Sequence, residues 1–183
     1  MKKVLLTVLF AVSLFSVNAQ SVKFGVKAGL NFATVNGDDV GTNVDPRTGF
    51  HAGGVAELKL TDKFSIQPEL LFSQLGSQSE GNKVRLNYLS LPVMAKFYLI
   101  EGLSVEAGPQ ASLLIDDKIE LVSGATPNVN WEDFEFGLNI GAGYTFNNGL
   151  FLQTRYAFGL TSIQEISDDT RNGSFQVSVG YLF

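Results

Sequence analysis

The sequence alternates apolar residues with small or polar residues in runs of roughly ten, and such runs recur along the chain after residue 20. In the first run, for example, Val22, Phe24 and Val26 alternate with Lys23 and Gly25. Successive side chains of a β-strand point to opposite faces, so each run predicts a strand with one apolar and one polar face. The eight predicted strands cover approximately 22–32, 49–60, 64–75, 86–98, 103–115, 134–146, 150–160 and 174–183.

The connections between the runs alternate between short and long. Short turns are predicted at 61–63, 100–102 and 147–149, and longer polar loops at 35–48, 76–85, 116–133 and 161–173. Outer-membrane barrels alternate short periplasmic turns with longer external loops in this way. We therefore expect an all-β fold, an eight-stranded antiparallel up-and-down transmembrane β-barrel. Pro68, Pro92 and Pro109 interrupt the third to fifth strands, where we expect local bulges or unpaired amides.

The first residues are typical of a cleaved export signal. Lys2 and Lys3 precede an apolar stretch at 4–17, which is too short to span a bilayer, and residues 17–19 have the small-residue pattern of a cleavage site. We expect a signal peptide at 1–19 and one mature barrel domain at 20–183. Cleavage changes the formal net charge from −5 to −7, because two lysines leave, and a chain this acidic is not expected to bind nucleic acid.

The polar face of the strands is expected to line the interior of the barrel. A soluble calyx would point its apolar face inward, whereas a membrane barrel points it outward to lipid. Here the polar face mixes charged residues with many glycines, and small residues suit the crowded interior of a narrow barrel. Aromatic residues also mark both ends of the apolar face, as expected at the two lipid interfaces. One girdle comprises Phe24, Phe64, Phe97, Tyr144, Phe146, Tyr181 and Phe183, and the other comprises Phe32, Phe50, Phe72, Phe134, Phe136, Tyr156, Phe158 and Phe175.

Six stretches of the mature chain resemble the PorT-like outer-membrane β-barrel family, which is common in Bacteroidetes. They are GVKAGLN at 25–31, GFHAG at 49–53, SIQPELL at 65–71, LNYL at 86–89 followed by LP at 91–92, VEAGP at 105–109 and GAGY at 141–144. The resemblance implies the barrel fold and an outer-membrane location, and it carries no shared catalytic motif. A few members are linked to protein secretion, so an accessory role there is one expectation. The terminal Tyr181 and Phe183 are similar to the C-terminal signal that the barrel-insertion machinery reads.

Charged residues on the inward face predict an interior network. The residues concerned are Lys27, Glu57, Glu69, Lys96, Glu106, Glu135 and Arg155, with Lys23 and Lys59 also facing inward. Folding the hairpin through the turn at 100–102 places Lys96 opposite Glu106, so these two side chains are expected to interact. Because the two signs are balanced, we expect an ion-paired plug in a narrow lumen rather than a selectivity ring, which would carry mainly one sign.

Candidate catalytic and metal sites are few. His51 would need a nucleophile and an orienting acid to act in a hydrolase. Ser73, Ser90 and Ser112 also face inward, but no nucleophile elbow accompanies them, so no enzymatic activity is expected. The chain has no cysteine and a single histidine, so no metal site of these residues and no cofactor is expected.

Acidic residues in the predicted loops are interpreted as a solvated surface, with weak Ca²⁺ or Mg²⁺ binding as the alternative. They are Asp38, Asp39, Asp45, Asp116, Asp117, Glu120, Glu132, Asp133, Asp168 and Asp169. Their spacing does not match an EF-hand.

These observations predict a non-enzymatic outer-membrane barrel with a structural or interaction role, four external loops and a lumen plugged by charges. A narrow low-conductance channel and an accessory component of a secretion system are the alternatives, and a lipid-modifying enzyme fits least. Expected partners are outer-membrane lipid or lipopolysaccharide, the insertion machinery, and an unidentified extracellular or periplasmic protein.

Overall fold

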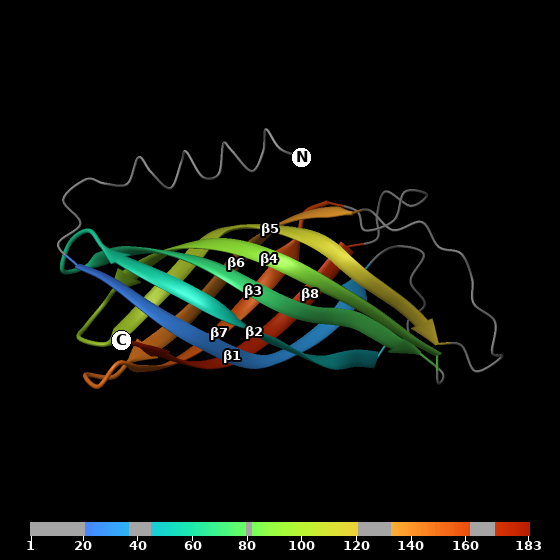
Figure 1. Cartoon of the computed structure of the whole chain (residues 1–183), viewed down its shortest axis with the longest axis horizontal. Coiled ribbons are helices and arrows are strands. Elements are labelled where there is room, and N and C mark those ends of the chain that lie inside the picture. Colours follow the sequence, from blue (N-terminus) through green and yellow to red (C-terminus); the bar gives the residue numbers. More distant parts are fainter. Residues whose placement is uncertain (1–20, 37–44, 80–81, 121–132, 162–170) are drawn as a thin grey trace.

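The computed structural model describes residues 21–36, 45–79, 82–120, 133–161 and 171–183, and these residues form a closed β-barrel. Its strands are β1 (Ser21–Asn36), β2 (Asp45–Lys59), β3 (Phe64–Ser79), β4 (Asn82–Tyr98), β5 (Leu103–Glu120), β6 (Phe134–Thr145), β7 (Leu150–Gly159) and β8 (Arg171–Leu182). Each strand pairs antiparallel with the next, and β8 pairs with β1 to close the wall (Figure 1). The predicted eight-stranded antiparallel barrel is confirmed. No helix in the described part of the chain is long and apolar enough to cross a membrane.

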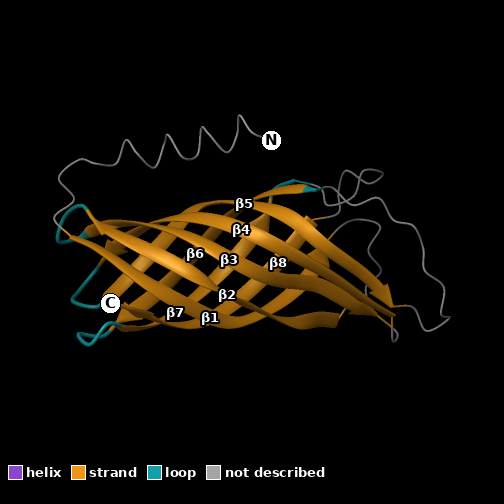
Figure 2. Ribbon diagram, viewed as in Figure 1, coloured by secondary structure: helices purple, strands orange, loops and turns teal. Residues whose placement is uncertain are grey.

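The short connections and the C-terminus lie at one end of the barrel, which we call the turn end, and the opposite end is the loop end (Figure 2). Gly102 and Gly149 shape two of the turns, with φ values of 81° and 91° that residues with a Cβ rarely adopt. In the last turn the backbone N–H of Gly149 donates to the carbonyl oxygen of Phe146 at 3.0 Å. The Asn-Gly hairpin predicted at 147–149 is therefore present.

The strands extend further toward the loop end than the sequence pattern predicts. The largest difference from the predicted strand bounds is at 76–85. The sequence pattern predicts a polar loop there, whereas Gly76 pairs with Arg85 and Ser79 pairs with Asn82. Residues 45–48 and 116–120 are likewise in strands. Polar composition marks where a strand leaves the lipid, but backbone pairing continues in water. As a result, β3, β4 and β5 reach beyond the shorter β6, β7 and β8 (Figure 1).

The two faces of the wall are as predicted, with apolar side chains outside and polar side chains inside. On β6, for example, the outward Leu138 is 45% exposed whereas the inward Asn139 is 1% exposed. Aromatic side chains pair on the outer surface at both ends. The pairs are Phe32–Phe175, Phe50–Phe72, Phe134–Phe136 and Tyr156–Phe158 toward the loop end, and Tyr144–Phe146 at the turn end. This inside-out arrangement is that of a barrel surrounded by lipid.

The prolines produce gaps in pairing but no bulges. Beside Pro68 the pairing of β2 with β3 stops at Val55–Glu69 and resumes at Leu58–Ile66 in the same register. The β3–β4 pairing beside Pro92 and the β4–β5 pairing beside Pro109 are interrupted in the same way. The expectation of unpaired amides is met, and the expectation of bulges is wrong at these positions. A proline removes one donor, but the neighbouring bonds of a closed wall keep the strands in register.

Small apolar clusters occupy the interior at both ends of a polar middle. Toward the loop end the cluster contains Ala33, Leu75, Leu86 and Tyr88, with Leu114 packed against it. Toward the turn end it contains Val55, Phe151 and Leu182. The polar residues between these clusters are therefore enclosed along the barrel axis as well as by its wall.

Candidate functional site

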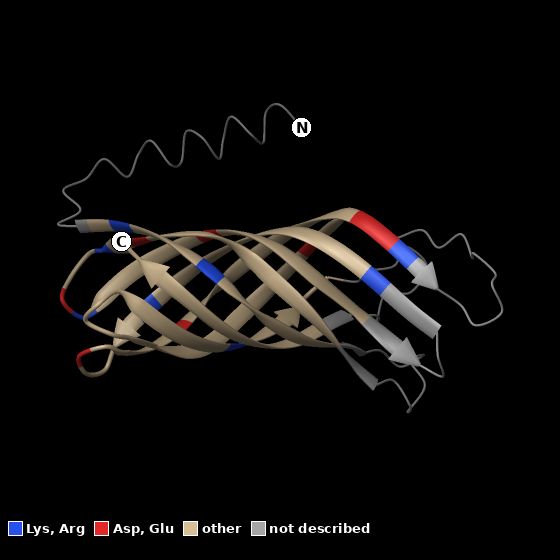
Figure 3. Cartoon of the chain, turned by 60° about the horizontal axis from the view of Figure 1, so that its bottom comes forward, with Lys and Arg blue, Asp and Glu red and all other residues tan. Residues whose placement is uncertain are grey.

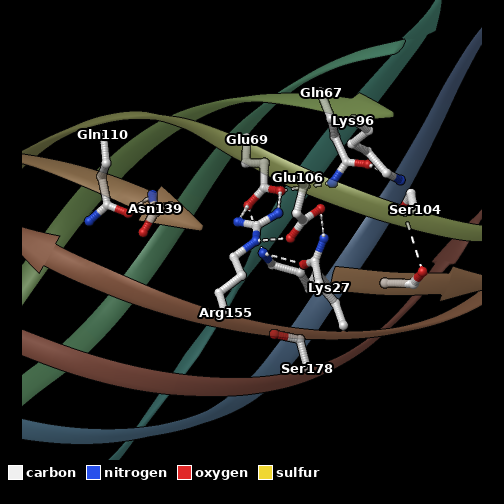
Figure 4. Close-up of polar contacts among 12 residues, drawn as sticks. Lys27, Gln67, Glu69, Lys96, Ser104, Glu106, Gln110, Asn139, Arg155 and Ser178 are labelled. Atoms are coloured by element: carbon white, nitrogen blue, oxygen red, sulfur yellow. Dashed lines mark hydrogen bonds and ion pairs between the residues drawn. The ribbon is translucent and has the colours of Figure 1, made fainter. Parts of the chain in front are cut away.

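A buried network of charged side chains crosses the middle of the barrel (Figure 4). Arg155 of β7 donates from Nη1 to Glu69 Oε2 at 2.9 Å and from Nε to Glu106 Oε1 at 2.5 Å. Lys27 Nζ of β1 lies 2.6 Å from the same Oε2 atom of Glu69. Each of these four side chains is at most 3% exposed. Because every charge has a partner of opposite sign, the network avoids the large cost of an isolated buried charge.

Gln153 completes this central network. Its amide donates to Glu106 Oε2 at 2.7 Å, and its Oε1 atom accepts from Lys27 Nζ at 3.1 Å. Both oxygens of Glu106 therefore have donors, as do both oxygens of Glu69. A network satisfied in this way is rigid, since any displacement breaks several charge-assisted bonds together.

A second cluster lies nearer the turn end and is joined to the first. Lys96 Nζ of β4 donates to Glu57 Oε2 of β2 and to Gln67 Oε1 of β3, each at 3.0 Å. The Tyr98 hydroxyl donates to the other Glu57 oxygen at 2.5 Å. Gln67 then donates to Glu69 at 2.7 Å, so both clusters form one continuous system.

The register predicted for Lys96 and Glu106 is confirmed, because the two residues are Cα partners in the β4–β5 hairpin. The predicted contact between their side chains is wrong: Lys96 binds Glu57, and Glu106 binds Arg155. Three of the four ion pairs of the network join strands two places apart, namely β1 to β3, β2 to β4 and β5 to β7, whereas the Arg155–Glu69 pair joins β7 to β3. Inward side chains converge toward the axis of a narrow barrel, so long side chains meet partners from the next strand but one.

The remaining predicted interior charges lie outside these clusters. Lys23 and Lys59 are exposed at the turn end, where Lys59 Nζ lies 4.0 Å from Asp62. Both line a cavity at that end, in agreement with the predicted inward orientation, but they take no part in the buried network. Glu135 is 7% exposed and lines a small interior cavity of about 10 Å³ toward the loop end, together with Gln110 and Asn139.

His51 is the centre of a separate buried chain of hydrogen bonds. Its Nδ1 lies 2.7 Å from Asn31 Oδ1, and its Nε2 lies 2.8 Å from Ser178 Oγ. Asn31 donates onward to Ser73 Oγ at 3.0 Å. His51 and Ser178 are on strands that flank β1, and Gly29 of β1 is the Cα partner of both. The missing side chain at Gly29 leaves room for the imidazole to reach Ser178.

Of the serines considered from the sequence, only Ser73 joins this chain, while Ser90 and Ser112 hydrogen-bond each other at 3.0 Å. Sequence reasoning missed Ser178, because its contact with His51 can be recognised only once β8 is known to pair with β1. Ser178, His51 and Asn31 are hydrogen-bonded in the same order as the serine, histidine and orienting residue of a hydrolase triad. His51 and Ser178 are nonetheless only 1% and 4% exposed, so a substrate has no access to them in this closed interior.

The described residues contain no group of three or more His, Cys, Asp or Glu side chains placed to hold a metal ion. Several of the acidic candidates, namely Asp38, Asp39, Glu132, Asp168 and Asp169, lie outside the described residues. Asp116 is described, and its carboxylate accepts from Asn87 Nδ2 at 2.9 Å on the outer surface.

Tyr181, near the end of β8, and Phe183, which follows β8, lie at the turn end of the barrel. Tyr181 pairs with Val26 and Leu150, and the N–H of Phe183 donates to the carbonyl oxygen of Phe24 at 2.8 Å. The Tyr181 and Phe183 side chains are exposed on the outer surface at the turn end. Their recognition by the insertion machinery stays a prediction.

Comparison with known proteins agrees with this architecture. Residues 18–165 match the family described as outer membrane protein beta-barrel domain. Among solved structures, Neisserial surface protein A superposes with a TM-score of 0.62 at 14% identity, covering 89% of this chain and 99% of that one. Ail of Yersinia pestis, in complex with the heparin analogue sucrose octasulfate, gives 0.53 at 17% identity, with 89% and 99% covered. OprG of Pseudomonas aeruginosa gives 0.50 at 12% identity, with 89% and 96% covered. The sequence matches no curated protein.

Proposed function

The chain belongs to the family of outer membrane protein beta-barrel domains, and we propose that it is a closed, non-enzymatic barrel that acts by presenting its ends to other molecules. Its location is the outer membrane. The short turns of such barrels face the periplasm, so the loop end is the external end. The proposal therefore has two parts, a sealed lumen and an interacting external surface.

The observation that carries the proposal is the Arg155–Glu69 pair. The two residues come from β7 and β3, which are four places apart in a ring of eight strands. The bond therefore runs across the lumen, and Lys27 and Glu106 fill the space beside it. A selectivity ring would present charges of one sign to an open path. Here charges of both signs neutralise each other, which supports a plug.

The external surface is formed by the extended parts of β3, β4 and β5. On its outer face Gln74, Asn87 and Asp116 form a hydrogen-bonded row just beyond the aromatic residues, and Lys118 follows. These polar groups project above the lipid on a paired sheet, which is a firmer platform than a loop. We propose that this platform and the connections above it contact other molecules of the cell envelope or surroundings.

Three alternatives make different demands. An accessory role in protein secretion, which the PorT-like sequence motifs suggest, would require a secretion component as the partner. A hydrolytic role would require a substrate to reach Ser178. Because His51 and Ser178 are both buried, we do not propose a hydrolytic role. A narrow channel would require a conducting lumen.

Photo-crosslinking in living cells tests the interaction role. A photoreactive amino acid at Lys118, which is exposed at the external end, should give discrete protein or glycolipid adducts. The matched control carries the same photoreactive amino acid in place of Leu152, which is 48% exposed on the lipid face. This control should give only phospholipid adducts. Identical adduct patterns at the two positions would contradict the proposed external surface.

A further inference from the structure

The turn end of the barrel contains a cup-shaped cavity of about 550 Å³. It is surrounded by the start of β1 and by all the short turns, which contribute residues from 59–63, 98–102 and 145–147. Glu57 and Leu182, which are both buried, also line it. The volume lies within the range of roughly 300–1,000 Å³ that is usual for small-ligand sites. Since turns of this kind face the periplasm, the cup opens to the periplasm.

Charged and apolar residues are segregated around the cup. Lys23, Lys59 and Lys63 come from β1 to β3, on one side of the ring. Leu99, Ile100 and Phe146 come from the turns between β4 and β7, on the other side, where they are exposed and form the rim between the outer surface and the cup. Figure 3 shows charged residues gathered at this end, near the C-terminus. The cup therefore offers ammonium groups facing an apolar wall.

The acidic residues that line the cup do not neutralise all of its lysines, so the cup can still bind an anion. The Glu57 carboxylate is already bound by Lys96 and Tyr98, so it presents no unpaired charge to the cavity. Asp62 has a fully exposed side chain, 4.0 Å from Lys59, where water screens it. Glu101 is exposed on the β4–β5 turn. Lys23 and Lys63 remain as the cations best placed to meet a ligand, because neither forms an ion pair within the described part of the chain.

We propose that this cup binds the free carboxyl end of a periplasmic polypeptide. The terminal carboxylate lies on the side of Lys23 and Lys63, and the last apolar side chain lies against Leu99, Ile100 and Phe146. A charge-assisted bond to a carboxylate is among the stronger polar contacts available to a ligand. Thr145 and Asn147 also line the cup and supply polar groups for peptide N–H and C=O groups, which a fatty acid would leave unused. The inference goes beyond the proposed function, which concerns the lumen and the external end.

The test uses the mature chain in lipid nanodiscs and the probe acetyl-Ala-Ala-Leu-Phe, compared with the same peptide amidated at its C-terminus and with decanoate. The free acid should bind saturably by calorimetry, and the amide at least about tenfold more weakly, because it lacks the charge. Affinity for the acid should fall with added salt, since the lysines are exposed.

Variants locate the site. The double variant Lys23→Gln and Lys63→Gln should bind the acid no better than the wild type binds the amide. Lys118→Gln removes a cation at the opposite end and should bind as the wild type does. Circular dichroism and heat-modified gel mobility verify that each variant is folded. Equal affinities for acid and amide, no saturable binding, or equal losses in the two variants would overturn the proposal. Decanoate binding as tightly as the peptide would overturn the assignment to a polypeptide.

Discussion

Arg155 donates to both carboxylate oxygens of Glu69, and the two residues lie on strands at opposite positions of the barrel wall. This fork-shaped contact ties β7 to β3 across the lumen, while Glu106 and Lys27 hold the two partners from the side. Arginine suits the position because its planar guanidinium can bind two carboxylates at once. Loss of one partner would leave several buried charges uncompensated.

The first prediction follows from this burial. Arg155→Met should lower the free energy of unfolding by roughly 3–5 kcal/mol, because Glu69 and Glu106 would keep buried charges without their main partner. Arg155→Lys should recover part of the loss, since it restores a charge but not the fork. Urea unfolding in phospholipid vesicles measures both. The matched control is Lys59→Met, which removes an exposed ion pair at 4.0 Å and should cost at most about 1 kcal/mol. Similar losses for Arg155→Met and Lys59→Met would contradict the stabilising role of the network.

The second prediction concerns the space that Gly29 leaves for His51. A Cβ atom at Gly29 would lie 2.8 Å from Nε2 of His51 and would also meet the backbone of β8. Gly29→Ala should therefore separate His51 from Ser178 and lower the free energy of unfolding by roughly 1–3 kcal/mol. Gly54→Ala is the control, since the nearest atom to its added Cβ would be 4.0 Å away. It should be neutral or stabilising by up to about 1 kcal/mol. Equal losses would show that Gly29 is not needed to admit the imidazole.

The third prediction tests the lipid-facing surface. Leu138 and Leu99 are exposed to similar extents, at 45% and 52%, but Leu138 is in the middle of β6 and Leu99 follows β4 at the turn end. Leu138→Arg should cost roughly 2–4 kcal/mol in a bilayer, whereas Leu99→Arg should cost about 1 kcal/mol or less near the interface. Reversible folding into vesicles provides both values. A penalty that does not depend on position would mean that lipid does not surround β6.

The fourth prediction tests orientation. The chain has no cysteine, so single cysteines can be labelled without background. Cysteine in place of Lys118 should react in intact cells with a maleimide attached to a large polymer that cannot cross the outer membrane. Cysteine in place of Lys63 should react only after the outer membrane is permeabilised. Both lysines are exposed, so accessibility within the protein does not separate them. The reverse pattern of labelling would invert the assignment of the two ends.

The alternation of residue types was sufficient to predict the strands and their faces. The period of two places Leu138 outside and Asn139 inside without any knowledge of tertiary contacts, and short turns specify hairpin register. The pairing of Lys96 with Glu106 across the β4–β5 turn follows from that register. Strand ends were less predictable, because a polar residue such as Arg85 can continue a paired strand above the lipid.

The contacts inside the barrel could not be predicted from hairpin register alone. The Lys96–Glu57 pair and the Arg155–Glu69 pair join strands that are not neighbours, so they depend on barrel diameter, tilt and side-chain length. Ser178 became a neighbour of His51 only through closure of β8 on β1. Local patterns specify which residues face inward, whereas the closed wall decides which of them meet.

Single-channel recording in planar lipid bilayers tests the central claim most directly. The wild-type barrel should show no steady conductance above the leak of the bilayer, because the Arg155–Glu69 contact and its neighbours occupy the lumen. Insertion is verified independently by protease protection of the same vesicles before fusion. A steady, ion-selective conductance in the wild type, altered by substitution of Arg155 or Glu69, would contradict the plug and establish the barrel as a channel.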